Sequence, residues 1–398
     1  MKSIPLLFLP LFFVFAQACT QVSSRDSKQP PLPPAARNPH LRALIAEFDQ
    51  FFSDSMRGSQ TPGAALVIVK DSVVLFQRGY GLKAANKVLD SVGTNTVFRI
   101  GSLSKGFAGV LTGILVEEGK LAWEDRIVRY VPGFALSSPG QTGQIQLHHL
   151  LSHTTGLPYH AYTNMIERGY PLDSITSRFK KLKLHGKPGE IFSYQNAAFS
   201  LIGQAMEATS TGKSYPELLE RKIFKPAGMQ SASANWESIS QSHDLALPHR
   251  GLSPDSITHR FYNAAPAGGV NASIADMGAW LLVLLGYKPD VVSKATLDKV
   301  FTPVIRTGTE RQRWPGRSPA YYGMGWRILP NETDTLVYHG GAVNDFRSEI
   351  AFLRQDGIGI CVLFNASTPL ANSCMAAFWE KYLQRRAAIL NWKDALVD

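Results

Sequence analysis

The distribution of strand-like and helix-like segments along this chain constrains its fold more than any other feature. Two apolar runs, Ala64–Val69 and Val73–Arg78, flank a Lys70-Asp71-Ser72 turn, which predicts a β-hairpin near the start. A further strand-like run ends at Gly101, and the sequence from about Gly119 to about Pro289 is then mostly helices and long loops. Strand-like sequence returns, with a turn at Gln355-Asp356-Gly357, in four late segments: 323–328, 336–339, 348–353 and 359–364.

Helical patterns frame and separate these strands. Leu41 to Met56 repeats apolar residues at helical spacing, and so does Ala371 to Gln384. The intervening sequence is mostly helices and long loops, including a helix over Asn196–Thr209 and one opened by the capping-box-like Ser273-x-x-Asp276. This order predicts one α/β unit with an all-helical lobe inserted. The predicted bounds are a domain over 40–386, its α/β part over 40–101 and 300–386, and its helical lobe over 102–299.

Composition excludes some classes of function. The chain has 398 residues, of which 44% are hydrophobic and 18% charged, so it has ample material for a large core. The formal net charge is +10, but the basic residues are scattered. The densest cluster, Arg178–Lys183, holds a single aromatic residue, Phe179, and lacks the repeated stacking pattern of nucleic-acid binders. We therefore expect a solvated basic face, attracted to anionic envelope polymers, and no nucleic-acid partner.

The N-terminus has the pattern of an export signal. Lys2 precedes an apolar run from Ile4 to Phe15, and Ala16-Gln17-Ala18 is a small-x-small cleavage site, so we predict a signal peptide over 1–18. Cleavage would expose Cys19, as in a bacterial lipoprotein, although Ala16 stands where a lipobox has Leu. A polar, proline-rich tether over 19–39 follows. The prediction is a periplasmic protein that is either soluble or anchored to the outer membrane by lipid at Cys19.

The segment Phe98 to Lys105 holds most of an acyl-transfer site. A strand-like run ends at Gly101 and an apolar helix begins at Ser102, so Ser102 and Lys105 share one face of the first helical turn. A serine hydroxyl becomes nucleophilic when a neighbour takes its proton, and a partly desolvated lysine can do so. The helix N-terminus also favours negative charge developing at Ser102.

The same Ser-x-x-Lys spacing occurs twice more, without that context. One of these motifs begins at Ser177, inside a Lys/Arg-rich, surface-like stretch. The other begins at Ser210, close to Gly212, a residue typical of a helix end. We interpret both as solvated surface.

A second motif is Tyr194-Gln195-Asn196, which follows Pro188-Gly189 at the start of a helix. A phenol beside a cationic lysine has its pKa lowered, so Tyr194 is predicted to exchange a proton with Ser102 and the leaving group. Asn196 offers a donor and an acceptor, one for Lys105 and one for a substrate amide.

The third motif is His339-Gly340-Gly341-Ala342, in the late strand region. Consecutive small residues let a substrate carbonyl approach the main chain closely. The N–H groups of Ala342 and Ser102 are then predicted to form an oxyanion hole, with His339, Gly340 and Gly341 also contacting substrate.

Together these motifs make the sequence resemble the class C β-lactamase-like serine hydrolases, a group of β-lactamases, penicillin-binding DD-peptidases, D-aminopeptidases and esterases. The resemblance covers nearly all of Leu41–Leu383 and also includes Leu150–Pro158 and Pro266–Gly269. It implies an antiparallel sheet covered by the terminal helices, with the site in the cleft facing the helical lobe. It also implies acylation of Ser102, with Lys105 and Tyr194 as acid/base partners.

The chain departs from true class C β-lactamases at the third motif, where they have Lys-Thr-Gly. His339 is cationic only part of the time near neutral pH, and Gly340 has no side chain, so carboxylate recognition and β-lactam turnover are placed in doubt. The pattern favours an exported serine peptidase or esterase acting on an ester, amide or D-amino-acid or cell-wall-type peptide. The alternatives are a β-lactamase proper and a penicillin-binding sensor that acylates without turnover. An α/β-hydrolase is disfavoured, because its Gly-x-Ser-x-Gly motif is missing from a strand end.

No cofactor or metal is expected. His149 and His153 are four residues apart, but no acidic or cysteine ligand accompanies them, so local hydrogen bonding is the favoured interpretation. Glu190 could activate a deacylating water, although a structural hydrogen bond is favoured. Cys361 and Cys374 lie in apolar patterns, which favours two buried thiols over a disulfide. The sequence leaves the oligomeric state open.

Overall fold

The computed structural model describes residues 33–87, 89–308, 314, 317 and 319–394. The predicted signal peptide, Cys19 and most of the predicted tether lie outside the described residues. None of the described helices combines the length and apolar character needed to cross a membrane.

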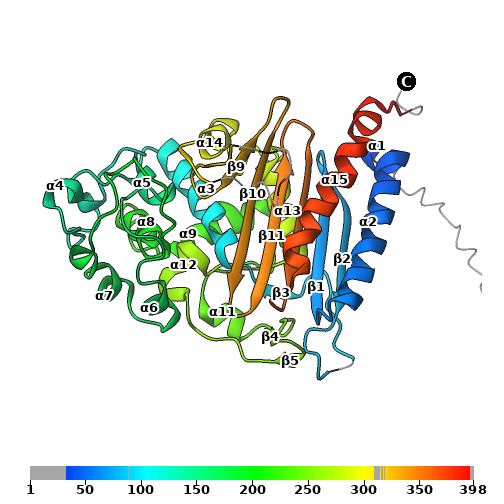
Figure 1. Cartoon of the computed structure of the whole chain (residues 1–398), viewed down its shortest axis with the longest axis horizontal. Coiled ribbons are helices and arrows are strands. Elements are labelled where there is room, and N and C mark those ends of the chain that lie inside the picture. The colour runs from blue at the N-terminus through cyan, green and yellow to red at the C-terminus, as the bar shows by residue number, and fades with distance from the viewer. Residues whose placement is uncertain (1–32, 88, 309–313, 315–316, 318, 395–398) are drawn as a thin grey trace, which may run out of the picture. The chain divides into compact units, whose positions relative to one another are not determined.

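An eight-stranded antiparallel sheet is the centre of the described fold, as predicted (Figure 1). Its strand order is β2-β1-β12-β11-β10-β9-β8-β7, so strands from the two ends of the sequence meet where β1 pairs with β12. The strands are β1 (Gly63–Lys70), β2 (Val73–Gly81), β7 (Ile305–Arg306), β8 (Tyr321–Tyr322), β9 (Arg327–Pro330), β10 (Thr335–Val343), β11 (Phe346–Leu353) and β12 (Ile358–Phe364).

The two faces of this sheet are covered by different helices. Successive side chains of β1 alternate between two apolar clusters: Leu66 and Ile68 join one, and Val67 and Val69 join the other. The first cluster also includes residues of α2 (Pro39–Gly58) and α15 (Leu370–Asn391), the two terminal helices, which lie side by side on that face (Figure 1). The helical lobe and α13 (Ile274–Leu284) cover the other face.

The inserted lobe is built from short helices and long loops, and it lies beyond the sheet face opposite α2 and α15 (Figure 1). Two small ladders, β3 (Val97–Arg99) with β6 (Asn271–Ser273) and β4 (His249–Arg250) with β5 (Ser253–Pro254), lie within this part of the sequence. The remaining helices are α1 (Pro34–Arg37), α3 (Ser104–Glu117), α4 (Pro139–Thr142), α5 (Leu147–Leu151), α6 (Thr163–Glu167), α7 (Leu172–Thr176), α8 (Asn196–Ala208), α9 (Tyr215–Leu219), α10 (Lys225–Ala227), α11 (Trp236–Ser240), α12 (Ala265–Gly268) and α14 (Lys294–Val300).

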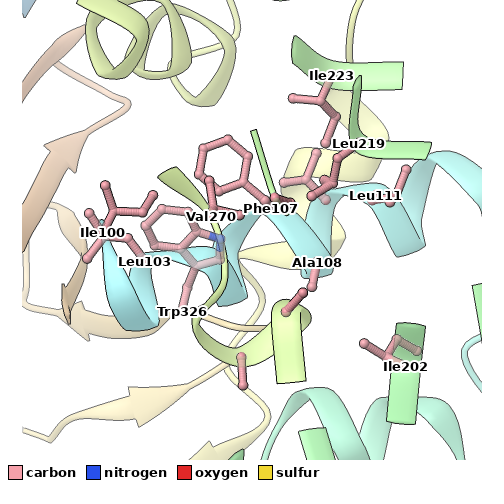
Figure 2. Close-up of a cluster of buried hydrophobic side chains, with 14 of the residues drawn as sticks. Ile100, Leu103, Phe107, Ala108, Leu111, Ile202, Leu219, Ile223, Val270 and Trp326 are labelled. Atoms are coloured by element: carbon pink, nitrogen blue, oxygen red, sulfur yellow. The ribbon is translucent and has the colours of Figure 1, made fainter. Parts of the chain in front are cut away.

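Helix α3 runs through the core and is buried on nearly every side. Figure 2 shows Phe107, Ala108 and Leu111 of α3 among side chains contributed by other segments, with Trp326 close by. A Cβ placed on Gly106 would lie 2.3 Å from the Trp326 ring, so only glycine allows this approach. The start of α3, where Ser102 and Lys105 lie, is therefore fixed by dense packing.

Three predicted elements differ from the structure. Residues 323–326 form a turn between β8 and β9 and not a strand, since Gly325 has φ of +84° and its N–H bonds to Leu151 O. Helix α15 continues to Asn391, seven residues past the predicted end. Helix α13, assigned from the sequence to the helical lobe, packs on the sheet against β1, β2 and β12. Cys361 and Cys374 are free, buried thiols, as predicted.

Candidate active site

Ser102 lies in a 3₁₀ turn, η1 (Gly101–Leu103), between strand β3 and helix α3. Gly101 has φ of +51°, which reverses the chain sharply after the strand. The Ser104 hydroxyl donates to Gly101 O at 2.6 Å and accepts from Val270 N at 2.9 Å, so the turn is fixed to the strand region. The sequence predicted an α-helical start at Ser102, and the tighter turn still leaves Ser102 and Lys105 facing each other.

Lys105 is completely buried and its amine has three polar neighbours. Its Nζ lies 2.8 Å from Asn196 Oδ1, 2.8 Å from Ala267 O and 3.3 Å from Ser102 Oγ. Burial, and secondarily the charge of Arg327, holds the pKa of Lys105 well below its ordinary value. A neutral amine has two N–H groups and one lone pair. The two N–H groups suit Asn196 and Ala267, which leaves the lone pair directed at the Ser102 hydroxyl.

Tyr194 completes a group of three. Its hydroxyl is hydrogen-bonded to Ser102, and Lys105 Nζ lies 4.7 Å from the centre of its ring. The sequence predicted a lowered pKa for this phenol, and that prediction is wrong. Burial dominates and raises the pKa of Tyr194, while the hydrogen bond to Ser102 and the charge of Arg327 only partly offset it. The phenol therefore holds its proton, and the lowered pKa of Lys105 favours its amine as the base of the pair.

His153 fixes the position of Tyr194 through contacts with its ring and with the residues on either side of it. The backbone N–H of Ser193 donates to His153 O at 2.8 Å, and that of Gln195 donates to His153 Nδ1 at 3.1 Å, so both neighbours of the tyrosine are fixed. The imidazole packs against the Tyr194 ring with 4.1 Å between ring centres. Burial, together with the charge of Lys105, holds the pKa of His153 well below its usual range, so the ring is neutral.

Asn196, the first residue of α8, bridges the site to the helical lobe. Its Oδ1 accepts from Lys105, as predicted from its two-sided chemistry, and its Nδ2 donates to Thr163 Oγ1 at 3.4 Å. Glu190 is exposed instead, and its carboxylate accepts from Lys187 N at 3.0 Å, which is the structural hydrogen bond favoured from the sequence.

The third motif lies on β10, whose outer edge is open beside Ser102. The β10–β11 hairpin turns through Asn344 and Asp345, both with positive φ, so Val343 and Phe346 form a hydrogen-bonded pair. Alternation then makes Ala342 and Arg347 a non-bonded pair, which points the Ala342 N–H away from β11.

Strand β9 pairs with β10 only as far as Tyr338 in the described part of the chain, so the edge at Ala342 stays open. A Cβ on Gly101 would lie 2.8 Å from Ala342 N, so the two main chains are in contact. The Ser102 N–H belongs to the first helical turn and has no intrahelical acceptor. The two predicted oxyanion-hole donors are therefore brought to the same place.

His339 lies beneath the pocket floor and is almost fully buried. Its Nδ1 donates to Gly340 O at 2.8 Å and its Nε2 lies 3.0 Å from the Tyr322 hydroxyl. Because burial raises the pKa of Tyr322, that phenol is protonated and donates to Nε2. Both ring nitrogens of His339 therefore have protein partners, and alternation along β10 directs its main-chain N–H and C=O to Ile350 of β11, so its hydrogen bonds give no support to the predicted substrate contact.

A pocket of about 400 Å³ opens over these groups. It is lined by Ser102, Tyr194, Asn196 and all four residues from His339 to Ala342, so it gathers every predicted site residue except the buried Lys105 beneath. Arg327 also lines it and was missed from the sequence, because nothing near Trp326-Arg327 resembles a motif. The Ala267 carbonyl that accepts from Lys105 was likewise unassigned.

The histidines that suggested a metal site make local contacts. His149 Nδ1 accepts from Gln146 N at 3.1 Å, and His148 Nδ1 lies 3.2 Å from Trp123 O. Burial lowers the pKa of His149 to about 4. Among the residues that the structure describes, no cluster of three metal-type side chains is found.

The comparisons with known proteins agree with this geometry. A model of the family described as beta-lactamase matches residues 48–381. The chain belongs to the beta-lactamase family. Membership confirms the resemblance inferred from the sequence and identifies a hydrolase of the beta-lactamase fold, which supports a serine hydrolase in general.

Individual relatives are distant. Protein flp of Staphylococcus aureus (strain MW2) is 27% identical over 330 residues, which are 81% of this chain and 63% of that protein. Unguisins hydrolase ungD' of Aspergillus campestris is 26% identical over 347 residues, with 83% and 63% covered. This chain thus spans less than two thirds of the length of these relatives. The octameric penicillin-binding protein homologue from Pyrococcus abyssi has a similar structure, with a TM-score of 0.73, 27% identity, and coverage of 84% of this chain and 77% of that one.

Proposed function

We propose that this protein is an exported serine hydrolase that works through an acyl-enzyme at Ser102. The observation that carries the proposal is the environment of Lys105: a buried amine of lowered pKa that lies 3.3 Å from Ser102 Oγ and 2.8 Å from each of two other acceptors, Asn196 Oδ1 and Ala267 O. This arrangement supports proton removal from Ser102 as it attacks an ester or amide carbonyl.

In the acylation step, Ser102 Oγ forms a bond to the substrate carbonyl carbon and its proton passes to Lys105 Nζ. Negative charge develops on the carbonyl oxygen, where the N–H groups of Ser102 and Ala342 donate to it. Asn196 Oδ1 and Ala267 O stabilise the resulting ammonium, which has a third N–H for Tyr194 or the leaving group.

Tyr194 serves as the proton relay. Its raised pKa keeps the phenol protonated until the leaving group departs. The phenol then gives its proton to the departing oxygen or nitrogen and is reprotonated by Lys105 in the same step. Water then attacks the acyl-enzyme, and the same groups return a proton to Ser102 Oγ as the acid leaves.

The substrate class we propose is an ester, amide or peptide of the D-amino-acid or cell-wall type, in preference to β-lactams. Arg327 supplies a cation in the catalytic pocket, on the side where Tyr194 would protonate the leaving group. A leaving group that ends in a carboxylate fits that position. One relative is named a hydrolase and one similar structure is a penicillin-binding protein homologue, which supports a hydrolase related to penicillin-binding proteins.

The test combines turnover with covalent labelling. Wild-type protein should hydrolyse 4-nitrophenyl acetate and gain the mass of a penicillin or a fluorophosphonate, and Ser102→Ala should lose both. Ser177→Ala and Ser210→Ala, the serines of the other two Ser-x-x-Lys spacings, are matched controls that should keep them. Wild-type rates in Ser102→Ala would overturn the proposal. A panel of nitrocefin, a D-Ala-D-Ala peptide and a D-amino-acid amide then identifies the substrate class.

The second candidate is a penicillin-binding sensor that acylates without turnover. Glu190 favours keeping this candidate, because the carboxylate that the sequence offered for activating the deacylating water is exposed, bonds to Lys187 N and does not line the catalytic pocket. A single stoichiometric burst of nitrophenol that then stalls would indicate the sensor, and steady release would indicate the hydrolase.

Export is part of the same proposal. Signal cleavage before Cys19 followed by lipidation would leave a protein that sediments with membranes, and Cys19→Ala would release it. A periplasmic wild-type protein that remains soluble would instead indicate cleavage without an anchor.

A further inference from the structure

A cavity of about 410 Å³ lies in the helical lobe, and none of the described residues that line it also lines the catalytic pocket. Helices α3 and α8 begin at the active site, near Ser102 and at Asn196, and each is about 20 Å long. The cavity opens at their other ends, beside Lys120 and the turn over 209–213. It is therefore separate from the site of the proposed chemistry.

Among the residues that the structure describes, four basic side chains and no carboxylate line this cavity: Lys120, Lys213, Arg221 and Lys222. We propose that it is an anion site that binds a phosphate group, carried as a monoester or a diester. The proposal goes beyond the proposed function and does not depend on it. A phosphate presents three or more acceptor oxygens around one centre, so cations on several sides can bind it at once, whereas a carboxylate presents two oxygens in one plane.

Two of the lysines share one carboxylate. Glu118 forms ion pairs with Lys120, at 2.7 Å, and with Lys222, so a single negative charge serves two cations. Other acids on the same segments have partners outside the cavity lining, which are Ser293 for Glu117, Tyr215 N for Glu207 and Lys225 for Glu220.

The other two cations have no ion-pair partner. Neither Lys213 nor Arg221 forms an ion pair with any residue that the structure describes. Hydrogen bonds from Ser214 and, to a smaller extent, the charges of Arg221 and Lys213 hold the pKa of Glu217 below its ordinary value. That carboxylate lies outside the lining and is fixed at the start of α9, where it accepts from Ser214 N and Oγ, both at 2.7 Å. Lys213 and Arg221 are thus available to a ligand.

Ser210 gives a second, independent indication of a ligand. The sequence predicted solvated surface at this serine, but the residue is only 7% exposed and its Oγ has no hydrogen-bond partner among the described residues. A buried hydroxyl without a partner costs folding free energy. Ser210 lines the cavity and its hydroxyl can rotate about χ1, so a phosphate oxygen held there can accept its proton in a hydrogen bond.

Helix ends explain only part of the positive charge. The last turn of a helix carries about half a negative charge, which a nearby cation complements. Lys120 and Lys213 lie just beyond the ends of α3 and α8, but Arg221 and Lys222 belong to η4 (Glu220–Phe224), inside the continuous helix from α9 to α10. Even with the two nearby carboxylates and both helix ends counted, the cations outnumber the negative charges.

The core fixes the backbone that carries Arg221 and Lys222. Segment η4 is a single π-helical turn, and such turns are rare inside helices and frequent at functional sites. Leu219 and Ile223, on either side of the pair, are buried and lie close to Leu111 of α3 (Figure 2). The two cations are therefore held at the cavity by packing that needs no ligand.

The first experiment measures binding of soluble probes by isothermal titration calorimetry at physiological salt. The probes are inorganic phosphate and glucose 6-phosphate, with glucose as the uncharged reference. Lys213→Gln/Arg221→Gln should weaken binding by at least about tenfold, and should stay folded in thermal unfolding because neither residue is in an ion pair. Lys180→Gln/Lys183→Gln, which removes the same charge from exposed positions elsewhere in the helical lobe, is the matched control and should bind like the wild type.

A second experiment distinguishes the source of the phosphate. It measures cosedimentation of the same variants with vesicles of phosphatidylglycerol and phosphatidylcholine, with pure phosphatidylcholine vesicles as reference. Binding of a soluble probe that falls in Lys213→Gln/Arg221→Gln and persists in the control would indicate a soluble phosphate ester. The same pattern confined to phosphatidylglycerol vesicles would indicate a lipid headgroup. No binding of any probe by the wild type, or equal weakening in the two double variants, would overturn the anion site.

Discussion

Gly101 offers a direct test of the oxyanion hole. In Gly101→Ala the new Cβ would lie 2.8 Å from Ala342 N and 2.9 Å from Ala342 C and O, closer than such contacts can remain. Because the contacted atoms are main chain on both sides, β10 must shift away from η1, which separates the Ala342 N–H from the substrate carbonyl. Loss of one oxyanion donor lowers kcat by about 10²–10³-fold, or about 3–4 kcal/mol of transition-state stabilisation.

Gly119→Ala is the matched control for backbone strain. Gly119 has φ of +68°, close to the +51° of Gly101, but a Cβ there would have open space around it. A left-handed alanine costs roughly 1–2 kcal/mol of folding stability in either variant. With an unfolding entropy of about 2.1 cal/mol/K per residue, that corresponds in a domain of this size to a decrease in Tm of roughly 1–3 °C.

The assay is steady-state hydrolysis of 4-nitrophenyl acetate together with thermal unfolding of each variant. Both variants should lose stability, and only Gly101→Ala should lose two to three orders of magnitude in kcat/KM. If Gly101→Ala stayed folded and remained within about threefold of Gly119→Ala, the Ala342 N–H would have no part in catalysis.

Three further predictions concern charge. Asn196→Asp should raise the pKa of Lys105 by placing a carboxylate at its Nζ, so acylation slows at neutral pH and recovers at alkaline pH in stopped-flow measurements; an unchanged pH profile would contradict the role of Lys105 as base. The free energy of unfolding should fall as pH decreases from about 7 to 4, because His149 and His153 are buried with lowered pKa and the unfolded chain binds more protons; urea titrations should show a weaker dependence in His153→Gln. Asp334→Asn should lower the free energy of unfolding by about 3 kcal/mol or more, because this buried carboxylate is paired with two arginines. The exposed Asp54→Asn is the control, and an equal loss of stability in the two variants would contradict this reasoning.

The fold was predictable where a segment's pattern decides its structure. Strands β1 and β12 are apolar along their length and β-branched, and α2 repeats large apolar residues on one face, so local sequence suffices. The predicted strand at 323–328 was wrong over residues 323–326, for a tertiary reason, and right over 327–328, which belong to β9. Gly323 and Gly325 form a turn whose amide bonds to Leu151 and whose backbone packs on Lys105, and neither partner is near in sequence.

The candidate active site likewise has a part that local sequence predicts and a part that depends on tertiary packing. Ser102 and Lys105 face each other because of spacing within one turn, so the sequence predicts the pair. The ionisation of Tyr194 depends on its burial against His153, Tyr322 and His339, which come from three separate segments, and local sequence provides no measure of that burial. A nearby cation was visible and predicted the opposite pKa shift from the one that burial produces.

The His339-Gly340-Gly341 motif acquires a different meaning from its packing. A Cβ on Gly340 would lie 2.9 Å from Glu349 Oε2 and 3.1 Å from the Tyr338 hydroxyl, and one on Gly341 would lie 2.3 Å from Ile100 O. Glycine is therefore required at Gly341 by a main-chain atom, whatever the substrate, whereas at Gly340 the contacted atoms are the ends of side chains. Since His339 is also hydrogen-bonded beneath the pocket, the motif sets the close approach of β10 to Ser102. Under the proposed function, we therefore expect recognition of a substrate carboxylate to depend on Arg327, which lines the catalytic pocket at a position that the motif comparison leaves out.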